Sequence, residues 1–156
     1  MRAQPILIAY RRFEQLQELL FARDYLIDPG GRDPNEWRDD PPLGLVRPKG
    51  VALKGEGDET EPDPRITFSI VEFWSVDRVE DAREEQGYWL AGYAYHGQVG
   101  DVSLRYCFDP ERHPEMPYHR HPPGRKAREP WRRVSAEEAL EGIDALVTEE
   151  RRAGQL

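Results

Sequence analysis

The sequence predicts an α+β fold, in which a central antiparallel β-sheet is flanked by an N-terminal and a C-terminal helix. Three observations support this class: an amphipathic stretch at 5–24, three strand-like runs between 66 and 108, and a helix-start signal followed by an apolar stripe at 135–152. At 156 residues, the chain is long enough for one hydrophobic core and short for two. We therefore expect a single domain.

Residues 5–24 are predicted to form the first helix. Pro5 is suited to a first helical turn, and apolar residues follow it at spacings of three and four, with charged residues between them. The next stretch, 28–64, holds half of the prolines and six glycines, a composition that does not sustain a long regular element. It is predicted to be an inserted loop, in which 44–46 and 51–53 form a small hairpin.

Three runs rich in β-branched and aromatic residues predict strands at 66–75, 88–95 and 102–108. The third run alternates apolar and polar residues, as a strand with two different faces does. Gly97 and Gly100 lie between the second and third runs and favour a turn, so these two strands are expected to pair as an antiparallel hairpin. That pairing would place His96 close to Arg105 and Tyr106.

The last third of the chain combines an extended segment with a helix. Six prolines between 109 and 130 exclude a long helix there, so this segment is expected to be extended or turned. Ser135-Ala136-Glu137-Glu138 has the pattern of a capping box, and an apolar stripe follows it. This pattern predicts a terminal helix at 136–152.

The composition restricts the cellular compartment and the partners that we expect for the protein. The single cysteine, Cys107, excludes an internal disulfide, and the apolar run before Arg11 is too short for a signal peptide or a membrane span. A cytoplasmic protein without membrane association is therefore expected. The net charge of −8 argues against a general nucleic-acid coat protein, yet the segment 105–133 alone has a net charge of +4.

All four histidines lie within 26 residues that overlap this basic segment: His96, His113, His119 and His121. Histidine is the side chain whose ordinary pKa lies near neutrality, so such a concentration indicates proton transfer or metal ligation. Because His119 and His121 are two residues apart on an extended backbone, they are expected to point to one face, with Arg120 on the other.

Several motifs in this region occur in a fixed order: Tyr93-Ala94-Tyr95-His96-Gly97-Gln98, Leu104-Arg105-Tyr106, Asp109, His113-Pro114-Glu115, Pro117 and Tyr118-His119-Arg120-His121. The series resembles the TumE-like family of small prokaryotic toxin components over about residues 66–150. The chain departs from the family pattern in having Cys107-Phe108 after the Arg-Tyr pair and Tyr118 at the head of the histidine cluster. The resemblance implies a cytoplasmic toxin of a toxin–antitoxin system, with a small helix-turn-helix antitoxin as its partner.

The residues themselves favour a metal-independent endoribonuclease. Such a reaction needs a base for the 2′-hydroxyl proton, an acid for the departing 5′-oxygen, and a cation near the phosphate. His119 and His121 are predicted to be the acid–base pair, and His96 or His113 completes the site. Arg105 is predicted to hold the phosphate by paired hydrogen bonds.

Aromatic and basic residues around the histidines are candidates for RNA binding. Stacking on unpaired bases is predicted for Tyr95, Tyr118 and Trp131. Attraction of phosphates is predicted for Arg120, Arg125, Lys126, Arg128, Arg132 and Arg133. Packing in the core or on the sheet is the more common role for a strand tyrosine such as Tyr95. The basic run is most often a solvated loop, and it could also be a docking place for an acidic antitoxin segment.

Two alternative functions remain open at this stage. Asp109, His113, His119 and His121 provide enough nitrogen and oxygen ligands for zinc or another divalent metal, which would make the protein a metal-dependent nuclease or hydrolase. The basic segment would also serve a non-enzymatic module that binds RNA or protein. A homo-oligomer is compatible with each of these readings.

Overall fold

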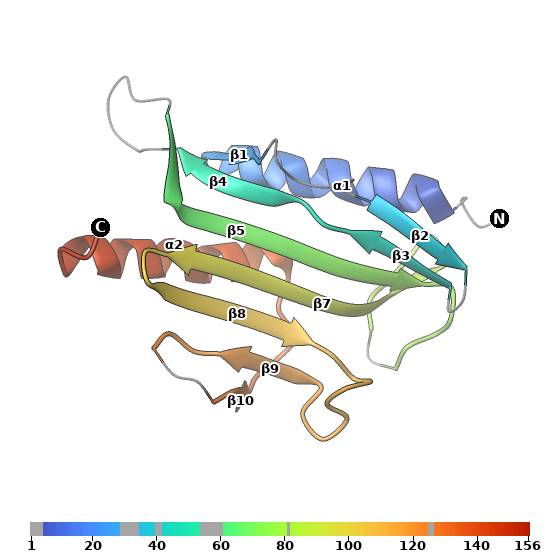
Figure 1. Cartoon of the computed structure of the whole chain (residues 1–156). Coiled ribbons are helices and arrows are strands. Elements are labelled where there is room, and N and C mark those ends of the chain that lie inside the picture. Colours follow the sequence, from blue (N-terminus) through green and yellow to red (C-terminus); the bar gives the residue numbers. More distant parts are fainter. Residues whose placement is uncertain (1–4, 29–34, 40–41, 54–60, 81, 125–126) are drawn as a thin grey trace.

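A computed structural model describes residues 5–28, 35–39, 42–53, 61–80, 82–124 and 127–156 of the chain (Figure 1). They form one antiparallel sheet and two helices, α1 (Pro5–Ala22) and α2 (Ala136–Arg152), which confirms the predicted α+β class. The strands are β1 (Tyr25–Ile27), β2 (Asn35–Asp39), β3 (Pro42–Val46), β4 (Lys49–Leu53), β5 (Pro62–Ser75), β6 (Glu84–Glu85), β7 (Tyr88–Val99), β8 (Val102–Phe108), β9 (Tyr118–His121) and β10 (Glu129–Pro130).

The long strands β5 and β7 form the middle of the sheet. The strand order is β1-β4-β5-β7-β8-β9-β10, and β2 and β3 extend the sheet beside the C-terminal half of β5. β7 and β8 form the hairpin predicted from the glycines between them, with His96 opposite Arg105 in the register. β9 then pairs with β8, so the segment that carries the histidine cluster lies beside the strand that carries Arg105 (Figure 1).

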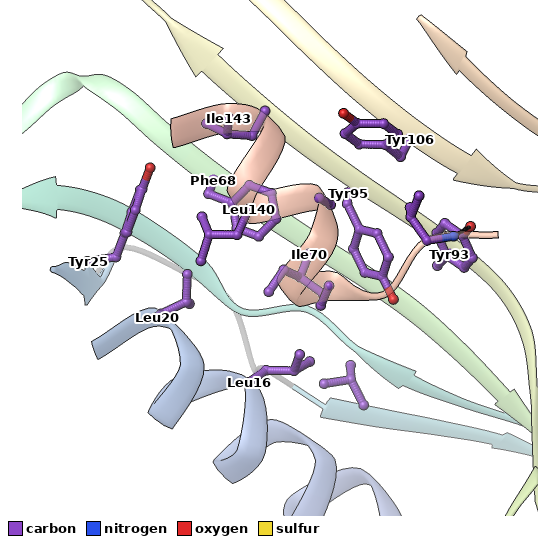
Figure 2. Packing of buried hydrophobic residues seen from close by; sticks show 14 of the residues in the cluster. Leu16, Leu20, Tyr25, Phe68, Ile70, Tyr93, Tyr95, Tyr106, Leu140 and Ile143 are labelled. Atoms are coloured by element: carbon purple, nitrogen blue, oxygen red, sulfur yellow. Dashed lines mark hydrogen bonds between the residues drawn. The ribbon is translucent and has the colours of Figure 1, made fainter. Parts of the chain in front are cut away.

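Both helices pack on the same face of the sheet. Gly50 on β4 and Gly97 on β7 flank Phe68 in one row across the sheet. A Cβ atom at Gly50 would lie 3.0 Å from Leu20 of α1, and one at Gly97 would lie 2.2 Å from Ile143 of α2. Figure 2 shows the side chains of Leu20 and Ile143 directed toward the sheet from the two helices. The opposite face, which we call the far face, is covered by neither helix.

The core lies between the helices and the sheet. Along β5 and β7, buried and half-buried residues alternate, and the buried set faces the helices. Tyr93 and Tyr95 stack with ring centroids 4.5 Å apart, and the capping box at Ser135 starts α2 next to them: the amide of Glu138 donates to the Ser135 hydroxyl over 3.0 Å. The hydroxyl of Tyr93 accepts a hydrogen bond from the amide of Val134, which ties the entry of α2 to β7.

A charged network crosses this core. The guanidinium of Arg12 on α1 donates to both carboxylate oxygens of Glu72 on β5, over 2.6 and 2.9 Å, and the Glu72 side chain has no solvent exposure. Tyr95 and Trp74 donate to the same carboxylate over 2.6 and 3.1 Å. Burial alone would raise the pKa of Glu72, but these donors and the Arg12 charge lower it below its ordinary value.

The structure corrects the prediction for 28–64. Instead of a loop, this stretch contributes β2, β3 and β4, and the predicted hairpin between 44–46 and 51–53 is wrong because β3 and β4 both pair with β5. Leu45 and Val46 are buried. The burial of short apolar segments against α1 and the sheet therefore outweighs the local tendency of a Gly- and Pro-rich composition.

Candidate functional site

The hairpin β7–β8 and the added strand β9 place polar side chains in two rows on the far face. His96, Arg105 and His121 are register partners across the three strands and form the first row. Cys107 and His119 are register partners one step further along and belong to the second row. Because side chains alternate between faces of a sheet, and Gly97 faces α2, both rows point away from the helices.

The first row consists of a guanidinium between two imidazoles. Arg105 is exposed, and His96 and His121 are half-buried. Adjacent strands lie about 4.8 Å apart, so the Cα atoms of the two histidines are about 9.5 Å apart. Burial lowers the pKa of His96, and the Arg105 charge lowers it further. Burial also lowers the pKa of His121, together with the charges of His119 and Arg105.

The second row is more deeply buried. Cys107 is 5% exposed and His119 is 3% exposed. The rings of His119 and His121 lie on the same face, as expected, with centroids 5.3 Å apart. Burial raises the pKa of the Cys107 thiol, and the neighbouring Arg105 opposes that rise. The predicted pair is therefore present, but only His121 of the two is open to a large substrate.

The proton on His119 can be placed from its hydrogen bond. Nδ1 of His119 lies 3.1 Å from the carbonyl oxygen of Met116. A carbonyl oxygen only accepts, so Nδ1 carries the proton, and Nε2 of the neutral ring keeps its lone pair. Burial lowers the pKa of His119, although the Met116 carbonyl opposes this, so the neutral ring is favoured.

The potential metal ligands differ from those predicted. One ligand atom each from Cys107, His119 and His121 lies within 4.8 Å of the others, whereas Asp109 and His113 belong to no such group among the residues that the structure describes. The ring of His113 lies 5.2 Å from that of His119, and its Nε2 is 3.1 Å from Arg128. His113 therefore lies beside the cluster and links it to a cation.

The structure corrects the role predicted for Tyr95. This residue is 1% exposed, and its hydroxyl donates to Glu72 in the core, so stacking of Tyr95 on RNA bases is wrong for this fold. Tyr118 and Arg120 alternate with the two histidines of β9 and so lie on the helix side of the sheet. Tyr118 stacks on Phe108, with ring centroids 4.4 Å apart.

The predicted RNA-binding cations are spread over different surfaces. Arg120 is paired with Glu129, and its guanidinium lies 3.7 Å from the ring of Trp131. Arg132 is paired with Glu138 at 2.6 Å, and Arg133 is exposed near the start of α2. Arg128 alone of the described predicted cations contacts the histidine cluster, at His113. Arg125 and Lys126 lie outside the described residues.

A pocket of about 390 Å³ adjoins the two rows on the far face. Its lining includes three arginines from separate segments: Arg38 of β2, Arg105 of β8, and Arg112 after β8. Phe73 and Cys107 also line it. Arg38, Arg112 and Cys107 were not proposed as site residues from the sequence, although Cys107 could have been found from its position two residues after Arg105 on a predicted strand.

No family model, curated protein or solved structure matches this chain. The likeness to TumE-like toxins therefore stays a prediction from the motifs. In the part of the chain that the structure describes, neither helix combines the length and the apolar character that crossing a bilayer requires.

Proposed function

We propose that the protein is an endoribonuclease, acting as the toxin of a toxin–antitoxin pair, and that its active site is the row of His96, Arg105 and His121. The observation that supports this most is the order of the three groups: a guanidinium between two imidazoles, all on the far face. A phosphodiester bound to Arg105 would have an imidazole on either side. These are the groups that metal-independent RNA cleavage requires.

The reaction moves two protons and exchanges one bond at phosphorus. One imidazole takes the proton of the 2′-hydroxyl as the 2′-oxygen attacks the phosphorus. The other, protonated imidazole gives a proton to the 5′-oxygen as the phosphorus–oxygen bond breaks. The products are a 2′,3′-cyclic phosphate and a 5′-hydroxyl, and Arg105 stabilises the negative charge that builds on the phosphate oxygens. His119 lies beside His121 in the second row and takes no part in the proton transfers.

The surroundings of the row suit a single-stranded polyanion. Arg38 and Arg112 line the adjoining pocket, and Arg128 lies beside His113. These cations attract phosphates without regard to sequence, and the association is expected to weaken with salt. The open side of the sheet admits an extended strand more readily than a deep cavity would. A helix-turn-helix antitoxin that covers the far face would block this access.

The test is cleavage of a single-stranded RNA oligonucleotide by the full chain and by single variants. His96→Ala and His121→Ala are each expected to lower kcat/KM by at least about 100-fold, the lower end for acid–base catalysis. Arg105→Gln is expected to lower it by a similar factor because it removes the phosphate-binding charge. Arg152→Gln, an exposed arginine at the end of α2, is the matched control and should cleave like the wild type.

Thermal unfolding of each variant checks that the fold persists. Unchanged cleavage by both histidine variants would overturn the assignment of the active site. RNA that is bound in a salt-sensitive manner but never cut would instead identify a binding module, and that result would overturn the proposed enzyme.

A further inference from the structure

We propose that Cys107, His119 and His121 form a binding site for a zinc-class transition metal ion, and that zinc at this site switches off the ribonuclease. The first part is independent of the proposed function, and the second rests on it. The three ligands would be one thiolate and two imidazole nitrogens, a donor set that suits zinc and does not suit magnesium or calcium.

The geometry is close to that of a metal site. The ligand atoms of the three residues lie within 4.8 Å of one another. Around one tetrahedral zinc ion, such atoms are about 3.4–3.6 Å apart, as bonds of about 2.0–2.3 Å require. Metal binding therefore requires the three side chains to rotate until their ligand atoms lie closer together. The backbone needs no rearrangement, because β8 and β9 already hold Cys107 opposite His119.

A hydrogen bond prepares His119 for this role. The Met116 carbonyl accepts from Nδ1 over 3.1 Å and leaves Nε2 available as the ligand atom. Histidines that bind metals commonly have their second nitrogen held in this way by a carbonyl or carboxylate oxygen, which fixes the tautomer and the ring orientation. Cys107 has no disulfide partner, since it is the only cysteine of the chain.

Access to the site comes from the far face. Cys107 lines the 390 Å³ pocket, and His121 is half-buried, so an ion can reach the cluster from that side. The charges of Arg105 and Arg128 oppose a bound cation. That repulsion disfavours ions that bind mainly through charge, such as magnesium. The sulfur and nitrogen donors therefore determine which metal binds. Three protein ligands leave one position for water.

The inhibitory consequence follows from His121, which belongs to both sites. A ring nitrogen that binds zinc cannot at the same time accept or donate the proton that RNA cleavage needs. The zinc-bound protein is therefore expected to bind RNA at Arg105 and the neighbouring arginines without cutting it. Loss of Cys107 should weaken zinc binding and leave the row of His96, Arg105 and His121 intact.

The binding test uses the full chain after treatment with a chelator and gel filtration. Titration with cobalt is expected to give a sulfur-to-metal charge-transfer band that saturates at one equivalent, and zinc should displace the cobalt. Cys107→Ser should abolish the band and weaken zinc binding at least tenfold. His119→Gln should weaken zinc binding by a similar factor, and His96→Ala is the matched histidine control that should leave it unchanged.

A second measurement covers the case in which a buried variant fails to fold. In the wild type, Cys107 is the only thiol, so its rate of alkylation reports on the site directly. Zinc is expected to slow this alkylation at least tenfold, and magnesium at the same concentration should not. The absence of saturable cobalt or zinc binding by the wild type, or equal binding by a folded Cys107→Ser, would overturn the metal site.

Cleavage assays separate the two proposals. Zinc should stop cleavage by the wild type, whereas Cys107→Ser should still cut RNA at the same zinc concentration. A protein that binds zinc but cuts RNA in no state would overturn the ribonuclease and leave the metal site standing. Cleavage that zinc stimulates would overturn the inhibitory role.

Discussion

Glu72 is a carboxylate without solvent exposure that depends on Arg12 for its counter-charge. Removing one partner of a buried ion pair leaves the other charge unpaired and costs about 3–5 kcal/mol of stability. We expect Arg12→Met to lower the free energy of unfolding by about this amount, measured by urea denaturation. Arg11→Met is the matched control, because the Arg11 guanidinium donates to the exposed side chain of Gln86 rather than to a buried carboxylate, and it should cost about 0.5 kcal/mol or less. Equal losses in the two variants would contradict this account.

The lowered pKa of Glu72 makes stability depend on pH with a definite sign. A carboxyl group whose pKa is depressed by folding stabilises the fold above its ordinary value, here 4.5, and loses that contribution as the pH falls through the folded-state pKa. The stability difference between wild type and Glu72→Gln should therefore be constant from pH 7 to about pH 5 and should shrink toward pH 3. Urea denaturation across this range measures it, and a difference that stays constant to pH 3 would argue against the lowered pKa.

At the scale of single elements, β7 connects the core to the site. Gly97 of β7 faces α2, whereas the side chain of the preceding residue, His96, points to the far face. A methyl group at position 97 would lie 2.2 Å from Ile143, so Gly97→Ala should destabilise the protein by about 1–3 kcal/mol. Gly44→Ala, where the new methyl group meets contacts of 3.4 Å or more, is the control.

A second substitution tests the cause of that loss. Ile143→Val shortens the side chain that the new methyl group would meet. Combined with Gly97→Ala, it should cost less than the sum of the two single changes, as contacting residues do. Additive losses in thermal or urea unfolding would mean that the contact between β7 and α2 is not the origin of the effect.

Elements that depend on local signals could be predicted from the sequence. The alternation in 102–108 gave the bounds of β8, and the Ser135 capping box gave the start of α2. Within 28–64, the short strands at 44–46 and 51–53 were expected, but their pairing with β5 could not be predicted, because it does not depend on their own composition. The pairing of β9 with β8 spans a proline-rich turn and leaves no local signal either.

The candidate site could be predicted from the sequence only in part, because its residues come together through strand pairing. Clustering along the chain identified the four histidines and Arg105. The partners of these residues follow from the pairing of β9, which brings Cys107 to His119 and places His121 beside Arg105. In the folded chain His119 is buried, whereas His96 and His121 are half-buried, a distinction that the spacing of the histidines does not contain.

In the whole molecule, the hydrophobic core and the candidate site lie on opposite faces of one sheet. Both helices lie along one face of the sheet (Figure 1). The other face has His96, His119, His121, Cys107 and Arg105. An overall charge of −8 is compatible with RNA binding because several arginines gather on the far face and its rim. A site on a rigid sheet holds its groups at fixed separations, which acid–base catalysis requires.

The measurement that tests the central claim most directly is the analysis of products from single-stranded RNA incubated with the metal-stripped protein in a chelator. The account predicts fragments that end in a 2′,3′-cyclic phosphate, with no cleavage where the attacking 2′-hydroxyl is replaced by hydrogen. Intact RNA under these conditions, or fragments that end in a 3′-hydroxyl, would contradict it.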